Sequence, residues 1–230
     1  MAVNSRSDRL VTLTNPRAPV SEAYRTLRTN LEFSSLDKPI KTMVVTSPGP
    51  EEGKSTTLAN LAVTLAQAEK QVILVDCDLR RPSQHELFGL SNSAGLTTMV
   101  VDDEAMKKPP LLDTEVAGLR LLPSGPLPPN PSELVGSRRM AEIIAMLSEQ
   151  ADIVLFDAPP VIAVTDAAVL ASRVDGVLLV VKAGGTKRDQ ARKAKALLDK
   201  VNAHLVGAVL NNVKMDTSYY RYYAGQESTR

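Results

Sequence analysis

The segment SPGPEEGKSTT, residues 47–57, has the residue types of a phosphate-binding loop. Gly53, Lys54 and Ser55 stand in the order that ends such a loop and opens a helix. Backbone amides at a helix N-terminus cradle phosphate oxygens, the lysine reaches the β- and γ-phosphates, and the serine hydroxyl coordinates Mg²⁺. The expected nucleotide-binding residues of this segment are Gly49, Glu52, Gly53, Lys54, Ser55 and Thr56.

This candidate loop departs from the standard pattern at its first position. Pro48 stands five residues before Gly53, where the pattern has a glycine, and Gly49 follows it. A glycine-containing turn before an ordinary helix is the alternative interpretation. The apolar run that precedes the loop and the helical spacing that follows it favour the phosphate loop.

Two carboxylates stand in the segment VDCDLRRP, where a second apolar run ends. Asp76 and Asp78 are two residues apart, so on a strand they point to the same side, where one can order Mg²⁺ and the other can accept a proton from an attacking hydroxyl. The alternative is that an aspartate ending a strand caps the next helix. Cys77 is typical of a small buried residue rather than a nucleophile. Arg80 and Arg81 fit either solvated charges or contacts with phosphate or substrate.

A third polar position follows the run IVLF in the segment FDAPPV. Asp157 has the place of a Walker B carboxylate, which holds Mg²⁺ directly or through water. The alternative is a turn stiffened by Pro159 and Pro160, and the recurrence of three such segments after three runs weakens it. The expected metal-binding residues are Ser55, Asp78 and Asp157, and the expected catalytic residues are Lys54, Asp76 and Asp78.

Short apolar runs alternate along the chain with stretches at helical spacing, and these are the elements that must position the polar segments. Continuous runs of Val, Ile and Leu predict strands covered on both faces, at 41–47, 71–76, 119–124, 152–157, 176–182 and 205–211. The intervening spacing predicts helices at about 54–69, 132–149, 165–173 and 187–201. This alternation indicates a doubly wound α/β fold with a mostly parallel sheet, whose ligands bind at the carboxyl ends of the strands.

Composition narrows the class of protein. The 230 residues suit one large domain, and 27 basic against 26 acidic side chains give a net charge of +1, which gives no sign of a nucleic-acid partner. Apolar runs of about six residues are far shorter than the ~20 that a membrane helix needs. A single cysteine excludes an internal disulfide, and no charged-then-apolar leader opens the chain, so we expect a cytoplasmic location.

Four of the five tyrosines cluster near the C-terminus. They stand in the polar segment DTSYYRYYAGQESTR, which has no apolar periodicity to bury the rings, so their hydroxyls are expected to face solvent. Docking on a partner surface is one interpretation of such a cluster and covalent modification is the other. The candidate modification sites are Tyr219, Tyr220, Tyr222 and Tyr223.

Taken together, the phosphate loop, VILVDCDLRRP, LFDAPP and the tyrosine cluster resemble the bacterial tyrosine kinases that regulate capsule and exopolysaccharide synthesis. The segment LLPSGPLPPNPSELVGS, residues 121–137, looks like a signature of that family, and EAYRTLR matches its Glu-x-x-Arg-x-x-Arg pattern. The resemblance implies a P-loop ATPase fold like that of the partitioning ATPases, with ATP and Mg²⁺ as cofactors. It also implies that neighbouring subunits phosphorylate each other's tail tyrosines. Asp76 and Asp78 would share metal positioning and proton acceptance from the incoming tyrosine, with Asp76 as the expected base.

The resemblance also implies an organisation of the chain. Residues 1–215 would form the kinase domain, with an N-terminal oligomerisation segment at 1–35, and 216–230 would be a flexible tail. Related partitioning ATPases place an asparagine near adenine after the last strand, which would put Asn211 or Asn212 there. The residues of the expected subunit interface of a ring are Glu22, Arg25 and Arg28. The alternative to an interface is that these residues form a solvated helical face with an intrahelical ion pair.

Two departures and one rival function accompany the resemblance. Glu51 stands where relatives usually have glycine, so strain or a carboxylate near the phosphates would weaken ATP binding. The transmembrane half of some members is lacking here, so a separate transmembrane activator of the polysaccharide copolymerase type would recruit the chain to the inner face of the membrane. The rival is a nucleotide-switched positioning ATPase without kinase activity, or an adaptor whose tail only docks. Such ATPases usually carry a second lysine where this chain has Gly49.

Overall fold

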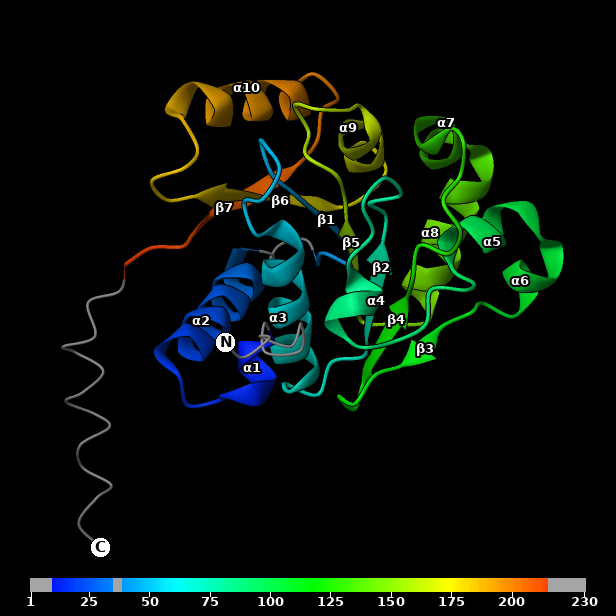
Figure 1. Ribbon diagram of the computed structural model, residues 1–230, viewed down its shortest axis with the longest axis horizontal. Helices are drawn as coiled ribbons and strands as arrows, with labels where there is room; N and C mark the ends of the chain where they lie inside the picture. The colour runs from blue at the N-terminus through cyan, green and yellow to red at the C-terminus, as the bar shows by residue number, and fades with distance from the viewer. Residues whose placement is uncertain (1–9, 35–38, 215–230) are drawn as a thin grey trace, which may run out of the picture.

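A seven-stranded sheet runs through the molecule in the order β3-β4-β2-β5-β1-β6-β7 (Figure 1). In this computed structural model residues 10–34 and 39–214 are described, so the tail tyrosines Tyr219, Tyr220, Tyr222 and Tyr223 lie outside the described residues. The strands are β1 (Thr42–Thr46), β2 (Val72–Asp76), β3 (Leu112–Asp113), β4 (Leu119–Leu122), β5 (Ile153–Asp157), β6 (Gly176–Lys182) and β7 (Leu205–Asn211).

All neighbouring strands pair in parallel except β3 and β4, which are antiparallel. The mostly parallel sheet and its six predicted strands are therefore confirmed. Each predicted run begins within one residue of the observed strand. The expected burial on both faces holds for β1 and β2 but is wrong for β7, an edge strand in which Leu210 is 60% exposed. The two-residue β3 was not predicted, because so short an edge strand has no detectable alternation.

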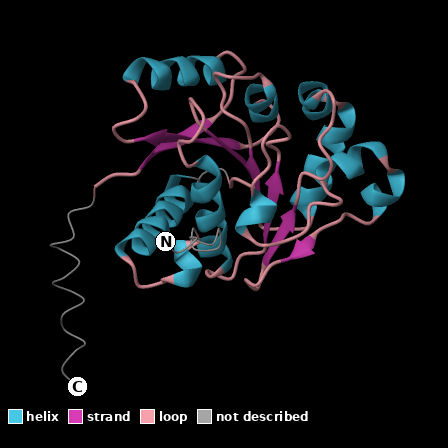
Figure 2. Cartoon of the chain, in the orientation of Figure 1, coloured by secondary structure: helices cyan, strands magenta, loops and turns pink. Residues whose placement is uncertain are grey.

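Helices cover both faces of the sheet (Figure 2). Side chains of β1 alternate between the two faces: Met43 and Val45 belong to the apolar cluster on one face, and Val44 belongs to the cluster on the other. Each cluster is covered by its own set of helices. The first set is α1 (Val11–Thr14), α2 (Pro19–Ser34) and α3 (Lys54–Ala66). The second is α5 (Leu96–Val101), α7 (Pro131–Gly136), α8 (Arg138–Glu149), α9 (Asp166–Ala171) and α10 (Arg188–Asp199). The two layers confirm the doubly wound architecture.

The helix predicted at 132–149 is divided into α7 and α8 at Ser137. Ser137 has an extended backbone, and its hydroxyl accepts a hydrogen bond from the amide of Met140, which caps α8. The guanidinium of Arg173 donates to the carbonyls of Val135 and Ser137, which stabilises the break. Short helices α4 (Gln84–Leu87) and α6 (Asp103–Lys107) were also not predicted, because one turn is too short to show a helical period.

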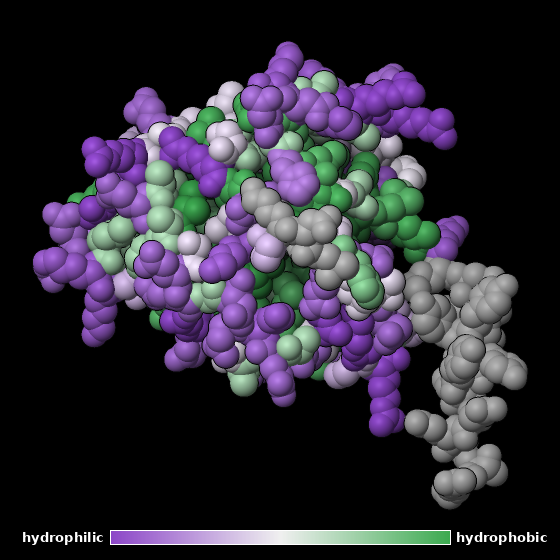
Figure 3. Space-filling model, turned by 180° about the vertical axis from the view of Figure 1, so that it is seen from behind, coloured by the Kyte–Doolittle hydropathy of each residue, from purple (hydrophilic) through white to green (hydrophobic). Residues whose placement is uncertain are grey.

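Polar side chains cover much of the face seen in Figure 3, with smaller apolar patches between them. Within the two described ranges, no helix has the length and apolar character that a bilayer crossing requires. The carboxyl ends of β1, β2 and β5 lie side by side in the middle of the sheet, because β5 pairs with both β1 and β2. The residues that follow these three strands are therefore brought to one place.

Candidate functional site

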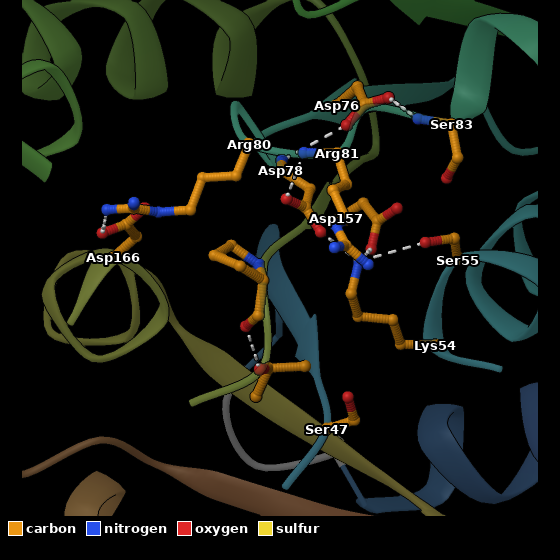
Figure 4. A network of polar contacts seen from close by, with 12 residues as sticks. Ser47, Lys54, Ser55, Asp76, Asp78, Arg80, Arg81, Ser83, Asp157 and Asp166 are labelled. Atoms are coloured by element: carbon orange, nitrogen blue, oxygen red, sulfur yellow. Dashed lines mark hydrogen bonds and ion pairs between the residues drawn. The ribbon is translucent and has the colours of Figure 1, made fainter. Parts of the chain in front are cut away.

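Lys54 is the centre of a polar cluster at the carboxyl ends of these strands (Figure 4). Its Nζ lies 2.9 Å from Oδ2 of Asp78, 3.0 Å from Oδ1 of Asp157 and 3.1 Å from Oγ of Ser55. Lys54 opens α3, while the two carboxylates follow β2 and end β5. The structure thus brings together polar residues from all three segments that the sequence singled out.

The charges of this cluster compensate each other. Burial alone would lower the pKa of the Lys54 ammonium, but the Asp157 and Asp78 carboxylates outweigh burial and raise that pKa. Lys54 is therefore a cation paired with two largely buried carboxylates. Phosphate oxygens would have to compete with these carboxylates for the same ammonium group.

Asn211 braces the phosphate loop from the end of β7. Its amide Nδ2 donates a hydrogen bond to the carbonyl of Glu52 at 2.9 Å. The same Nδ2 would lie only 2.1 Å from a Cβ placed on Gly53, so position 53 has no room for a side chain. Gly53 also has a φ of +87°, which favours glycine. The carboxylate of Glu52 turns back into the loop, where Oε1 accepts from the amide of Gly49 at 3.0 Å. The Glu52 side chain thus contacts the loop itself, and a contact of Glu52 with the nucleotide stays a prediction.

Asn212, the second candidate near adenine, lines a cavity of about 520 Å³ between α2, the start of α3 and the end of β7. Tyr24, Leu27 and Val213 supply much of its apolar wall. Burial raises the pKa of the Tyr24 hydroxyl, and a hydrogen bond with Thr57 of α3 partly offsets this. A planar apolar ligand group suits such walls.

A separate cavity of about 280 Å³ adjoins the phosphate loop. Its lining includes Lys54, Ser55, Thr56, Asp78, Arg81 and Pro160. Asp78 therefore faces this cavity, and its Oδ1 accepts the backbone amide of Arg81 at 3.0 Å, which orients the carboxylate. A hydroxyl entering the cavity would find a carboxylate acceptor and the Lys54 ammonium on the same wall.

Asp76 has a different environment from Asp78. It is completely buried, and its oxygens accept the backbone amides of Asp78, Ser83 and Gln84 at 3.2, 2.9 and 2.9 Å. Burial and then the Asp157 charge raise the pKa of Asp76 to about 8, although these amides oppose the rise. Since Ser83 and Gln84 begin α4, Asp76 makes the contacts of the helix-capping alternative, and it is not among the residues that line the cavity.

Arg80 makes an ion pair away from the cavity. Its Nε lies 2.9 Å from Oδ2 of Asp166, and its NH2 lies 3.1 Å from Oγ of Ser132 in the segment 121–137. Asp166 begins α9 and is buried, and its Oδ1 also accepts from Ser132. This triad joins the loop after β2 to α7 and α9, so Arg80 has a structural partner that the sequence did not reveal.

The Arg80 pair leads to a prediction on acid stability. Burial alone would raise the pKa of Asp166, but the hydrogen bonds from Arg80 and Ser132 lower it overall. The resulting stabilisation is complete above the unfolded pKa of about 3.9 and is lost as the pH falls through the lower folded pKa. We expect the free energy of unfolding at pH 7 to be higher for wild type than for Asp166→Asn. At pH 3 the difference between the two proteins should be smaller. Urea titrations at both pH values measure it; an equal difference at both would exclude the ion pair as its source.

Glu51 has a left-handed backbone, with a φ of +58°, and lines the cavity beside the phosphate loop. Exposed Glu69, after α3, has a similar φ of +64° and provides a matched control. We expect Glu51→Gly and Glu69→Gly each to raise the free energy of unfolding by about 1 kcal/mol, because glycine relieves the strain. Only Glu51→Gly should also tighten ADP binding, since it removes a carboxylate near the phosphates. Calorimetric titration with ADP tests this; equal affinity in both variants would contradict it.

Oxygen ligands in this cluster fit a magnesium ion. Ser55 Oγ, Asp78 and Asp157 supply hard donors, which Mg²⁺ prefers, and Mg²⁺ usually keeps several waters and uses substrate phosphates as ligands. In the part of the chain that the structure describes, no group of three or more His, Cys, Asp or Glu side chains could hold a metal ion by itself. A cation here would therefore depend on the phosphates as well as on the protein.

The expected interface residues lie on α2. Arg25 NH1 pairs with Glu22 at 2.7 Å within the helix, and its NH2 donates to the carbonyl of Pro16. Arg28 instead reaches α3, where NH1 donates to the carbonyl of Thr64 at 2.7 Å. The intrahelical ion pair is present, and the role of this face in assembly stays a prediction.

Comparisons with known proteins identify the family and the fold of this chain. Residues 40–220 match the profile of the ParA family, described as NUBPL iron-transfer P-loop NTPase. Tyrosine-protein kinase YwqD of Bacillus subtilis is 43% identical over 95% of this chain and 92% of its own length. Among solved structures, the chimerical protein CapA2B2 has a TM-score of 0.86 with 38% identity over 90% of this chain and 91% of its own. The kinase domain of Escherichia coli tyrosine kinase ETK has 0.85 with 32% identity, over 91% and 82%.

Proposed function

This chain belongs to the bacterial tyrosine-protein kinases, within the ParA-type P-loop NTPases, and from that premise we propose that it transfers the γ-phosphoryl group of ATP to its own tail tyrosines. The observation that carries the proposal is the convergence of the Asp78 and Asp157 carboxylates on the Lys54 ammonium, beside a cavity that Lys54 and Asp78 line. The tail residues, Tyr219, Tyr220, Tyr222 and Tyr223, lie outside the described residues and enter from the sequence alone.

Each residue of the cluster has a proposed role. The amides of the loop ending at Gly53 and the ammonium of Lys54 bind and orient the phosphates. Ser55, Asp78 and Asp157 would hold a magnesium ion, which when bound would offset the negative charge of the phosphates. Asp78 accepts the proton of the incoming tyrosine, because it faces the cavity whereas Asp76 is enclosed by backbone amides. Such an acceptor is needed because the tyrosine hydroxyl has a pKa near 10.

The adenine base would lie at the other end of the nucleotide. Asn211 contacts the phosphate loop and Asn212 lines the larger cavity, so both asparagines stand where the β7 end meets α3. The apolar side chains of that cavity would cover the base, and an asparagine amide would pair with its polar edge.

Assembly and regulation form the second part of the proposal. Relatives of this chain are named as kinases, and a similar solved structure is a chimera named CapA2B2. We infer a homo-oligomeric ring in which each site receives a neighbour's tail. A separate transmembrane activator of the polysaccharide copolymerase type would bring the chain to the cytoplasmic face of the membrane, where it would regulate capsular or exopolysaccharide synthesis and phosphorylate tyrosines of other proteins.

Mass spectrometry of the tail after incubation with Mg·ATP and the activator segment tests the kinase proposal. Wild type should gain phosphate on the four tail tyrosines, and a variant with phenylalanine at all four should gain none there while still binding ADP. ATP turnover with an unmodified wild-type tail would instead support the nucleotide-switched positioning ATPase. Nucleotide binding without turnover or modification would support an adaptor.

The proposed role of α2 in assembly leads to a further prediction. Exchanging the charges, as Glu22→Arg with Arg25→Glu, keeps an intrahelical ion pair but reverses the charges that a neighbouring subunit would meet. We expect light scattering to show monomers for this double variant and oligomers for wild type, with similar melting temperatures. Unchanged assembly would remove the interface from these residues. Arg28 is left intact because it also joins α2 to α3.

A further inference from the structure

Gln84, the first residue of α4, joins three parts of the site although no sequence motif contains it. Its side chain is completely buried, and Nε2 donates to Oδ2 of Asp157 at 2.8 Å and to the carbonyl of Ser55 at 3.2 Å. Its backbone amide donates to Oδ2 of Asp76 at 2.9 Å. Gln84 therefore connects the end of β5, the phosphate-binding helix and the end of β2.

The orientation of the Gln84 amide follows from its neighbours. Both groups near Nε2, a carboxylate and a carbonyl, are acceptors, so the NH₂ end of the amide must face them. This leaves Oε1 buried and without a hydrogen-bond partner among the residues that the structure describes. A buried amide oxygen without a partner costs about 1–3 kcal/mol, and the two hydrogen bonds of Nε2 are what hold the amide in this orientation.

Asp157 divides its two oxygens between two partners. Oδ1 faces the Lys54 ammonium and Oδ2 accepts from Gln84. Lys54 is expected to turn to the phosphates when nucleotide binds, and the hydrogen bond from Gln84 would then still hold the plane of the Asp157 carboxylate. Because a metal ligand binds well only when its orientation is fixed, the hydrogen bond to Oδ2 has a direct consequence for metal binding.

We propose that Gln84 is a positioning residue for the metal site, which fixes the orientation of the Asp157 carboxylate that would bind magnesium. This inference rests on the proposed function, since it takes the bound ligand to be a magnesium–nucleotide complex. Gln84 acts through Asp157, and partners of this kind typically contribute 10–100-fold to metal affinity or activity. Its contacts with Ser55 and Asp76 keep the phosphate helix and the loop after β2 in register with that carboxylate.

The test is the gain in ADP affinity that magnesium produces, measured by calorimetric titration with Mg²⁺ and again with a chelator. For Gln84→Met, which has similar length and no amide, we expect this gain to fall at least about tenfold. Affinity without Mg²⁺ should stay within about twofold of wild type. The matched control is Gln71→Met, the same change at an exposed position beside β2, which should keep the full gain. A cooperative thermal transition in each variant establishes that both are folded.

Two results would overturn the inference, and they are distinguishable. If wild type shows a magnesium-dependent gain and Gln84→Met keeps it, Gln84 does not position the metal ligand, while the proposed function stands. If wild type shows no gain, the metal part of the proposed function fails and the inference fails with it. Should Gln84→Met not fold, Gln84→Glu replaces it: this side chain has the same size but presents oxygens to Asp157, and we expect the same loss.

Discussion

Replacing Lys54 with methionine is expected to abolish tail phosphorylation and also to destabilise the nucleotide-free protein by about 3 kcal/mol. The first effect follows from the proposed contact of the ammonium with the phosphates. The second follows from the ion pairs with Asp78 and Asp157, whose side chains are 6% and 0% exposed. Removing the cation leaves two buried carboxylates without their counter-charge, which is more costly than losing a surface pair.

Urea unfolding of three variants separates these two effects. Lys195→Met breaks an exposed pair with Asp199, at 2.7 Å, and should change the free energy of unfolding by less than about 1 kcal/mol. Lys54→Met combined with Asp78→Asn should recover part of the stability lost in Lys54→Met, because one of the unpaired charges is gone, but should recover no phosphorylation. If Lys54→Met were as stable as Lys195→Met, the cluster would not be coupled as the geometry indicates.

The ion pairs of Lys54 with Asp78 and Asp157 also indicate what must change when a nucleotide binds. The ammonium must leave Asp78 and Asp157 to reach the phosphates, so binding exchanges one set of charged partners for another. Magnesium arriving with the phosphates would restore a positive charge beside the two carboxylates. Nucleotide binding and metal binding are therefore expected to be coupled at this site.

The residues of this site that could be predicted from the sequence are those that follow a predicted parallel strand, because ligands bind at the carboxyl ends of such strands. Asp76, Asp78 and Asp157 follow continuous apolar runs, and in a parallel sheet the carboxyl ends of such runs meet at one edge. Lys54 follows a third run in a glycine-containing loop with a known phosphate chemistry. Local patterns thus placed these four residues together without any knowledge of strand order.

The parts that could not be predicted depend on contacts between distant residues. Gln84 meets Asp157 across 73 positions of the chain and Arg80 meets Asp166 across 86. A glutamine or an arginine near a turn is ordinary on a protein surface, so nothing local distinguishes these two from solvated residues. The different environments of Asp76 and Asp78 are equally non-local, because they arise from how the loop after β2 folds back toward α4.

Replacing Asp78 or Asp76 with asparagine is expected to impair different properties of the protein. Asp78→Asn should lower the rate of tail phosphorylation by at least about 100-fold, because the cavity loses its proton acceptor and a metal ligand. Asp76→Asn should mainly lower the free energy of unfolding, by about 2 kcal/mol. An asparagine has only one acceptor oxygen, so its NH₂ group would face either the amide of Asp78 or those of Ser83 and Gln84, and donors would face donors in a fully buried place.

Initial rates of tail phosphorylation, expressed per folded molecule, compare the two variants, and urea titration gives their stabilities. The neutral, nearly isosteric change keeps side-chain volume constant, so a difference between the variants reflects charge and hydrogen bonding rather than packing. A folded Asp76→Asn protein with a rate at least 100-fold below wild type, beside an active Asp78→Asn, would assign proton acceptance to Asp76 instead. That result would require the loop after β2 to open when substrate binds, because only then could the enclosed carboxylate reach a tyrosine hydroxyl.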